Sequence, residues 1–164
     1  MRSIIREKSH RLPKEFYQGT AIVAFTLCIK NREIIFQNPE LVDTFIGFLK
    51  EIAAKYNCKI PIYCFMPDHL HMIVTGTDDE VDLLKVIAGF KQRTGFWLSQ
   101  NKIGAQWQKD FYDHVIKKDE SLSTNVKYIL DNPVRKGIVM EWQEYPYKGA
   151  IGYDLADILI GLVS

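Results

Sequence analysis

The sequence predicts an α+β fold of the ferredoxin-like (split βαβ) kind, in which helices cover one face of an antiparallel sheet. Three observations predict it. Segments rich in β-branched and aromatic residues alternate with helical segments, their order is β-α-β-β-α-β, and a tight-turn signature joins the two central strands. The chain has 164 residues, the size of one domain, and shows no repeat or linker. We therefore expect residues 1–164 to form a single domain.

The first half of this pattern lies in the N-terminal part of the chain. Thr20 to Lys30 is predicted to be a buried strand because apolar, β-branched residues fill it. From Pro39 to about Asn57 the apolar residues follow helical spacing, and a proline suits the first turn of a helix. Two more strands, Lys59 to Met66 and His69 to Thr75, flank the turn residues Pro67-Asp68.

The second half repeats the helix and strand and adds a helix. A helix is expected from about Glu80 to Gln100, with acidic residues at its positive end. Phe111 to Lys117 alternates as a strand does. A short helix follows from about Leu122, and we expect Pro133 to terminate it. The apolar stretch Ala150 to Val163 is expected to form a short closing helix or a contact between subunits.

The composition excludes several classes of protein. Lys and Arg total 21 against 20 for Asp and Glu, so a net charge of +1 indicates no partner. The apolar runs are shorter than the ~20 residues that span a bilayer, and residues 1–16 lack the apolar core of a signal peptide. The three cysteines, Cys28, Cys58 and Cys64, form no CxxC pair. We expect a cytoplasmic protein with free thiols and no membrane partner.

The first candidate site is the pair His69 and His71. Residues two apart on a strand point to the same face, so both imidazoles would project side by side. Two neighbouring imidazoles form a chelating pair for a divalent ion. The alternative is a polar strand face that carries two incidental histidines, and the HxH motif by itself does not exclude it.

The second candidate site lies on the helix that precedes Pro133. Tyr128 and Asn132 are four residues apart, so on a helix they share a face. A phenol beside a carboxamide oxygen suits a nucleophile beside a metal ligand. Taken alone, these residues fit better with a packed tyrosine and a C-terminal asparagine ahead of a helix-stopping proline.

Three blocks of the sequence together carry a resemblance to a known family. They run from Tyr63 to Ile73 (YCFMPDHLHMI), from Trp107 to Ile116 (WQKDFYDHVI) and from Tyr128 to Gly137 (YILDNPVRKG). In this order they resemble the HUH single-strand DNA transposases of the IS200 type, the Y1 transposases. The second and third blocks are most similar to the branch called REP-associated tyrosine transposases. The resemblance spans about residues 17–148.

This resemblance implies a metal-dependent single-stranded DNA endonuclease and strand transferase that cuts at hairpin-forming DNA through a 5′-phosphotyrosine intermediate. It implies that Tyr128, on the C-terminal helix, is the nucleophile and that His69 and His71 are metal ligands. Asn132 is implied as the third ligand, where the insertion-sequence enzymes usually carry glutamine. The cofactor is expected to be Mn²⁺ or Mg²⁺, and two nitrogen ligands favour Mn²⁺.

Other functions fit these residues less well. A histidine-triad nucleotide hydrolase needs a third alternating histidine, and position 73 is Ile. Replication initiators and relaxases share the chemistry but are usually larger and often have two tyrosines. A non-catalytic transposase relic that binds hairpin DNA without cutting it stays open, although His69, His71 and Tyr128 are all present.

The expected partner is single-stranded or hairpin DNA, bound by a monomer or a homodimer in the nucleoid of a prokaryotic cell. Cations and aromatic residues are the candidate contacts, because cations follow phosphates and aromatic rings stack on unpaired bases. The ordinary alternatives are a solvated helix face for each cation and a core position for each ring. The basic arm, residues 1–19, would clamp a hairpin or form a tail, and residues 150–164 form a C-terminal tail. The candidate DNA contacts are Lys91, Arg93, Trp107, Lys109, Arg135 and Lys136.

Overall fold

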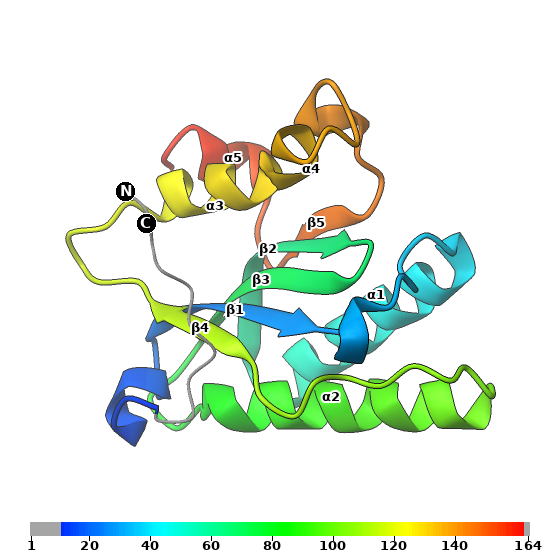
Figure 1. Cartoon of the computed structure of the whole chain (residues 1–164). Coiled ribbons are helices and arrows are strands. Elements are labelled where there is room, and N and C mark those ends of the chain that lie inside the picture. The colour runs from blue at the N-terminus through cyan, green and yellow to red at the C-terminus, as the bar shows by residue number, and fades with distance from the viewer. Residues whose placement is uncertain (1–10, 163–164) are drawn as a thin grey trace.

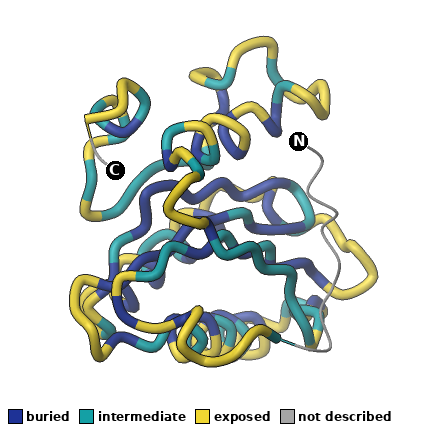
Figure 2. Tube along the Cα trace, turned by 90° about the vertical axis from the view of Figure 1, so that its left-hand side faces the viewer, coloured by how far each residue is buried: buried dark blue, intermediate teal, exposed yellow. Residues whose placement is uncertain are grey.

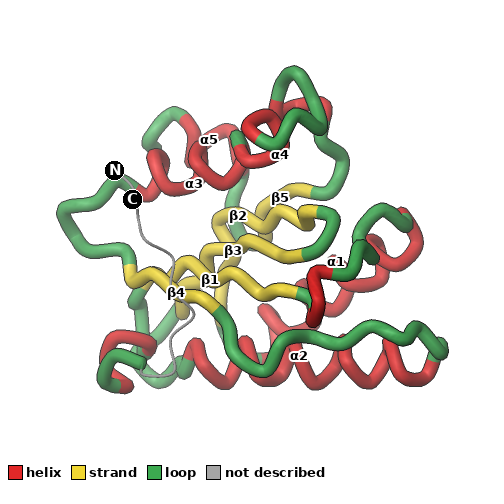
Figure 3. Tube along the Cα trace, in the orientation of Figure 1, coloured by secondary structure: helices red, strands yellow, loops and turns green. Residues whose placement is uncertain are grey.

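A computed structural model describes residues 11–162 of the chain and shows one five-stranded antiparallel sheet (Figures 1 and 3). The strand order across the sheet is β4-β1-β3-β2-β5, and all four neighbouring pairs are antiparallel. The predicted α+β, ferredoxin-like architecture is therefore confirmed. The strands are β1 (Ile22–Cys28), β2 (Cys58–Met66), β3 (His69–Gly76), β4 (Tyr112–Val115) and β5 (Lys148–Ile151).

The two long helices lie on one face of the sheet as predicted, and the short C-terminal helices cover the other face, which the sequence did not predict (Figure 1). On one face lie α1 (Pro39–Lys55) and α2 (Leu83–Gln100), which begin after the capping side chains of Asn38 and Asp82. The other face carries α3 (Leu122–Leu130), α4 (Asn132–Arg135) and α5 (Leu155–Leu159). Short 3₁₀ turns occupy η1 (Lys14–Tyr17), η2 (Lys30–Arg32) and η3 (Trp142–Glu144). In the described part of the chain, no helix combines the length and apolar character needed to cross a membrane.

Side chains alternate between two buried cores, one on each face of the sheet. Buried residues follow the strands in the middle of the molecule, and exposed residues lie mostly in the outer loops and helix surfaces (Figure 2). Val23, Phe25 and Leu27 of β1 point into the larger core with α1 and α2. Cys64 and Met66 of β2 belong to the second core, which the α3 side covers. Because Cys64 lies opposite His71 and Met66 opposite His69, both imidazoles point to the α3 side of the sheet.

The region around Pro133 departs from the sequence prediction. α3 ends at Leu130, and Pro133 lies in the first turn of the separate helix α4, so it begins a helix instead of terminating one. A proline suits that position because the first turn leaves its backbone nitrogens without helical partners. The break at Asp131 sets α4 apart from α3.

The two ends of the chain follow the predictions in part. The stretch predicted as a closing helix does contain α5, whose Ile158 is fully buried in the second core. β5, which overlaps its start, was not predicted. Residues 1–10 of the basic arm and residues 163–164 of the tail lie outside the described residues. The first described residue, Arg11, pairs with Asp113 at 3.3 Å and stacks 3.7 Å over the Phe111 ring.

Candidate functional site

The two histidines of β3 lie close enough to act together. Their Nε2 atoms are 3.0 Å apart, and the second ring nitrogen of each has a partner of its own. His69 Nδ1 is 2.6 Å from the Asp68 carboxylate, and His71 Nδ1 is 2.9 Å from the Thr26 hydroxyl. Because the Nδ1 atoms are occupied, both Nε2 atoms face the same space. This is the orientation that a chelating imidazole pair requires.

The surroundings of the pair favour neutral imidazoles. Burial, together with smaller contributions from the neighbouring His69 and Arg135, lowers the pKa of His71 to about 3. Burial also lowers the pKa of His69, although Asp68 opposes this effect. A neutral imidazole keeps a lone pair for a metal ion, so the two rings are in the protonation state of ligands at neutral pH.

The Asp68 carboxylate is ionised beside this pair. Burial raises its pKa, but hydrogen bonds from His69 and Arg32 outweigh burial and hold the pKa below its usual value. Arg32 donates to Asp68 from Nε at 2.8 Å and from Nη2 at 3.4 Å. The carboxylate therefore connects the histidine to a guanidinium from a different segment of the chain.

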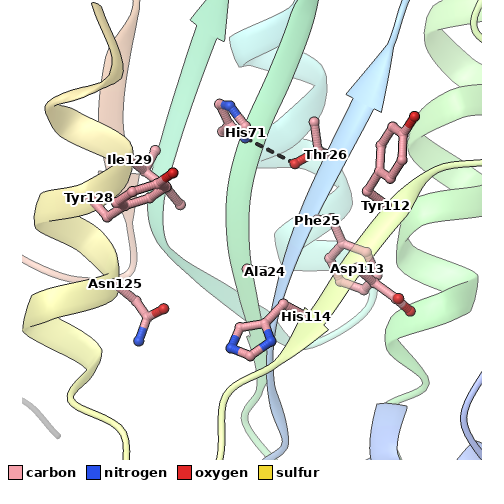
Figure 4. Close-up of a pocket in the computed structure, with 10 residues that line it drawn as sticks. All are labelled: Ala24, Phe25, Thr26, His71, Tyr112, Asp113, His114, Asn125, Tyr128 and Ile129. Atoms are coloured by element: carbon pink, nitrogen blue, oxygen red, sulfur yellow. Dashed lines mark hydrogen bonds between the residues drawn. The ribbon is translucent and has the colours of Figure 1, made fainter. Parts of the chain in front are cut away.

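Tyr128 is held at the site by the amphipathic helix α3. The Ser121 side chain caps the helix by accepting from the Thr124 backbone N–H, and the opposite side of the helix is buried in the second core. Tyr128 is left on the open side, with 54% of its surface exposed. Its ring extends from α3 toward β3 and lines the same pocket as His71 (Figure 4). The structure thus brings the predicted nucleophile and one predicted ligand together.

Asn132 is the first residue of α4 and is only 6% exposed. The polar atoms of its carboxamide are not among the fully buried side-chain atoms that lack a partner in the described residues, so solvent reaches them. Lys136, one turn later on the chain, lies close enough to lower the pKa of His69. α4 therefore ends in positive charge near the histidine pair. That Asn132 reaches a metal ion beside the two imidazoles stays a prediction.

These residues fit a divalent ion, although acidic and cysteine ligands do not contribute. Within residues 11–162, no three His, Cys, Asp or Glu side chains gather closely enough to hold a metal. The structure brings together two imidazole nitrogens, those of His69 and His71, and the carboxamide oxygen of Asn132 stays the predicted third donor. Nitrogen with one oxygen suits Mn²⁺ better than Mg²⁺, which prefers oxygen.

Of the six predicted DNA contacts, the structure brings two to this site. Arg135 and Lys136 are exposed and lie close enough to His71 to lower its pKa. The Arg135 guanidinium is 4.0 Å from the Tyr128 ring centroid and 3.3 Å from the Asp131 carboxylate. The other four residues, Lys91, Arg93, Trp107 and Lys109, lie on α2 or in the loop after it.

Of these four residues, Lys91 and Trp107 have hydrogen-bond partners within the protein, and Arg93 and Lys109 are exposed. Lys91 donates to the backbone oxygens of Gln108 and Lys109. Arg93 is exposed and stacks 4.4 Å over the Phe48 ring. Lys109 is exposed.

The Trp107 indole is half-buried and packs against the larger core. It donates to Thr94 Oγ1 at 2.8 Å and packs against Phe36 and Phe90. These contacts give the ring a packing role, and DNA contact by this group of four residues stays a prediction.

The structure adds residues that sequence reasoning did not assign to the site. Thr26 and Arg32 are brought to the histidines by the pairing of β1 with β3 and by the loop after β1. Asp68 stands directly before the HxH motif, a signal that was available in the sequence. His114 Nε2 is 2.9 Å from a carboxylate oxygen of Glu120, and His114 lines the pocket of Tyr128.

The fold and this histidine–tyrosine site define the class of protein, and comparison with known families names it. The family described as IS200-like transposases matches residues 18–132. Because this match covers well over half of the chain, the chain belongs to the IS200-like transposase family. The sequence-based identification of the family is confirmed.

Individual relatives are more distant. A putative REP-associated tyrosine transposase of Haemophilus influenzae is 23% identical over 145 residues, covering 82% of this chain and 81% of the relative. The REP-associated tyrosine transposase of Escherichia coli is 24% identical over 127 residues, covering 75% and 72%. A solved REP-associated tyrosine transposase bound to a REP hairpin superimposes with a TM-score of 0.70 at 20% identity, covering 86% of this chain and 81% of that one. The structural likeness confirms the fold.

Proposed function

We propose that this chain is a metal-dependent single-stranded DNA endonuclease and strand transferase that cuts at hairpin-forming DNA. The observation that carries the proposal is the shared pocket of Tyr128 and His71, with the Nε2 atoms of His69 and His71 3.0 Å apart. Membership of the IS200-like transposase family supports it, as does the REP hairpin bound to the structural relative.

In this reaction Tyr128 attacks the scissile phosphate. The bond from its Oη to phosphorus forms, the phenolic proton passes to solvent, and the bond from phosphorus to the 3′ oxygen breaks. The 3′ oxygen takes a proton and leaves as a hydroxyl, while the 5′ side of the DNA stays on Tyr128 as a phosphotyrosine. Attack by another 3′-hydroxyl reverses the step and joins strands, because the phosphotyrosine conserves the energy of the broken bond.

The protein must assist this attack, since a free phenol has a pKa near 10 and is a poor nucleophile at neutral pH. His69, His71 and Asn132 would hold the divalent ion, which when bound supplies Lewis-acid stabilisation of the charge that builds on the phosphate oxygens. Arg135 lies over the Tyr128 ring and, with Lys136, provides positive charge for the same phosphate.

The test is a pair of tyrosine variants incubated with labelled single-stranded hairpin DNA and Mn²⁺. Tyr128→Phe should bind the DNA like the wild type but form no covalent adduct, because it lacks only the attacking oxygen. Tyr112→Phe is the matched control, since Tyr112 lines the same pocket from β4, and it should form the adduct. An adduct with Tyr128→Phe would refute the assignment of the nucleophile. Hairpin binding by the wild type without any adduct would identify a non-catalytic relic instead.

A further inference from the structure

The imidazole of His69 has one proton position fixed by its neighbour. The Asp68 carboxylate accepts from Arg32 through both oxygens and lies 2.6 Å from His69 Nδ1, and a carboxylate only accepts hydrogen bonds, so this contact places a proton on His69 Nδ1. A neutral ring with its proton on Nδ1 carries its lone pair on Nε2. The ring is therefore set with its lone pair toward His71, whose Nε2 is 3.0 Å away.

Contacts of both its backbone and its side chain hold Asp68 in this place. The backbone oxygen of Asp68 accepts from the Ile29 N–H at 3.0 Å, which ties the β2–β3 turn to the end of β1. Arg32, in the η2 turn, donates hydrogen bonds to the carboxylate. In this turn Asn31 and Arg32 both have left-handed backbone angles, with φ of 61° and 55°. Such angles cost side-chain-bearing residues about 1 kcal/mol or more, so the rest of the loop must stabilise them.

His71 has a different kind of partner. The Thr26 hydroxyl lies 2.9 Å from His71 Nδ1 and, unlike a carboxylate, it both donates and accepts. It therefore accommodates either tautomer of His71. With the lone pair of His69 already on Nε2, the 3.0 Å separation suits an N–H···N bond in which His71 Nε2 donates and Thr26 donates to His71 Nδ1.

We propose that Asp68, held by Arg32, locks His69 in the tautomer that a ligand needs, while Thr26 lets His71 exchange tautomers when a divalent ion binds. On metal binding the proton of His71 moves from Nε2 to Nδ1 through solvent, Thr26 turns from donor to acceptor, and both Nε2 lone pairs become available. Asp68, Arg32 and Thr26 are positioning residues for the two imidazoles. The inference rests on the proposed function, because it takes His69 and His71 as metal ligands.

The tautomers of His69 and His71 are measured directly by ¹⁵N NMR of the imidazoles in metal-free protein. The affinity of the protein for Mn²⁺ is measured by calorimetric titration with MnCl₂. In the wild type, His69 should carry its proton on Nδ1 and His71 on Nε2. Asp68→Asn should lose the single His69 tautomer and bind Mn²⁺ about 10–100-fold more weakly, the usual cost of removing an outer partner of a ligating histidine. Glu51→Gln, the same carboxylate-to-amide change on the exposed side of α1, should change neither quantity.

The hydroxyl is tested in the same way. Thr26→Ser keeps a group that donates and accepts, so Mn²⁺ affinity should stay within about twofold, a change too small to signal a lost partner. Thr26→Val keeps the shape but removes the hydroxyl, so Mn²⁺ affinity should fall about tenfold or more while the His69 tautomer is retained. Arg32→Gln should weaken Mn²⁺ binding less than Asp68→Asn does. If Asp68→Asn fails to fold, Arg32→Gln tests whether the hydrogen bonds from Arg32 to Asp68 support Mn²⁺ binding.

The outcomes separate this inference from the proposed function. Wild-type His69 with its proton on Nε2, or Mn²⁺ affinities of Asp68→Asn and Thr26→Val equal to the wild type, would overturn the inference. Wild-type protein that shows the expected tautomers but binds no Mn²⁺ would overturn the metal role, and with it the part of the inference that concerns metal binding. Loss of binding in Thr26→Ser equal to that in Thr26→Val would show that packing at Thr26, not its hydroxyl, matters.

Discussion

The guanidinium of Arg135 lies 4.0 Å from the ring centroid of Tyr128, although the two residues belong to different helices. The break between α3 and α4 at Asp131 separates the two helices, and the Asp131 carboxylate holds the guanidinium at 3.3 Å. A cation over an aromatic face restricts the motion of the ring. The orientation of the proposed nucleophile therefore depends on a residue that was expected only to contact DNA.

Replacing Arg135 should slow the attack itself. A cation–π contact at an exposed site contributes about 0.5–1 kcal/mol, so Arg135→Gln should lower the single-turnover cleavage rate at saturating DNA about two- to fivefold. Lys127→Gln removes the same charge from the exposed side of α3 and is the matched control. Equal slowing by both variants would show that general electrostatic attraction of DNA, not the contact with Tyr128, accounts for the effect.

Alanine variants of Trp107 and Lys109 distinguish a role in packing from a role in DNA binding. The Trp107 indole donates to Thr94 and packs against Phe36, so Trp107→Ala should lower the free energy of unfolding by about 3 kcal/mol. Lys109 is exposed, so Lys109→Ala should leave stability within about 0.5 kcal/mol. If Lys109 contacts a phosphate, its loss should reduce the slope of log affinity against log salt by about 1.

Urea unfolding and DNA titration at several salt concentrations measure these quantities. Trp107→Ala protein that is as stable as the wild type but binds single-stranded DNA more weakly would favour base stacking by the indole. An unchanged salt slope in Lys109→Ala would remove that residue from the DNA surface.

The sequence predicted the main strands and the two long helices because their patterns are local. β5 was not predictable in this way: Lys148–Ile151 is short, contains Gly149, and becomes a strand only by pairing with β2. The glycine is required there, since a Cβ at Gly149 would lie 2.5 Å from the Tyr63 hydroxyl. Close approaches of this kind arise from tertiary packing, which a periodicity search does not detect.

The residues of the candidate site likewise divide into those that local patterns predict and those that only tertiary structure brings together. His69 and His71 share a face because of strand geometry, which the sequence alone supplies. The partners Thr26 and Arg32 depend on the register between β1 and β3 and on left-handed turns after β1, so no local motif could identify them. Pro133 was misassigned because a proline both ends one helix and begins another, and the local sequence does not distinguish the two.

The buried cysteines give the protein a specific response to alkaline pH. Burial raises the pKa of Cys58 to about 11 and that of Cys64 to about 12, from an ordinary value of 9.0. The folded state therefore keeps protons that the unfolded state releases above pH 9, so the free energy of unfolding should fall as pH rises from about 9 toward 12. Urea unfolding across this range should show a smaller fall for Cys64→Ala.

The same burial should make these thiols unreactive in the native protein. At pH 8 a thiol reagent should modify Cys58 and Cys64 only in urea, because the thiolate is the reactive form and both groups are buried. Rapid modification of Cys64 in native protein at pH 8 would contradict the raised pKa.

The last prediction concerns Asn132, the proposed third ligand. If its carboxamide oxygen completes the site, Asn132→Ala should raise the Mn²⁺ concentration for half-maximal cleavage by about tenfold or more, since losing a ligand should cost at least as much as losing an outer partner. Asn132→Asp should keep or lower that concentration, because a carboxylate is a stronger ligand for a hard cation. Its buried charge should also make the metal-free protein less stable, so Mn²⁺ should raise its melting temperature more than that of the wild type. Asn101→Ala, an exposed asparagine after α2, should match the wild type in both assays. If both Asn132 variants melt at lower temperature but keep the wild-type half-saturation point, Asn132 has only a structural role in α4, and His69 and His71 are the only protein ligands of the proposed site.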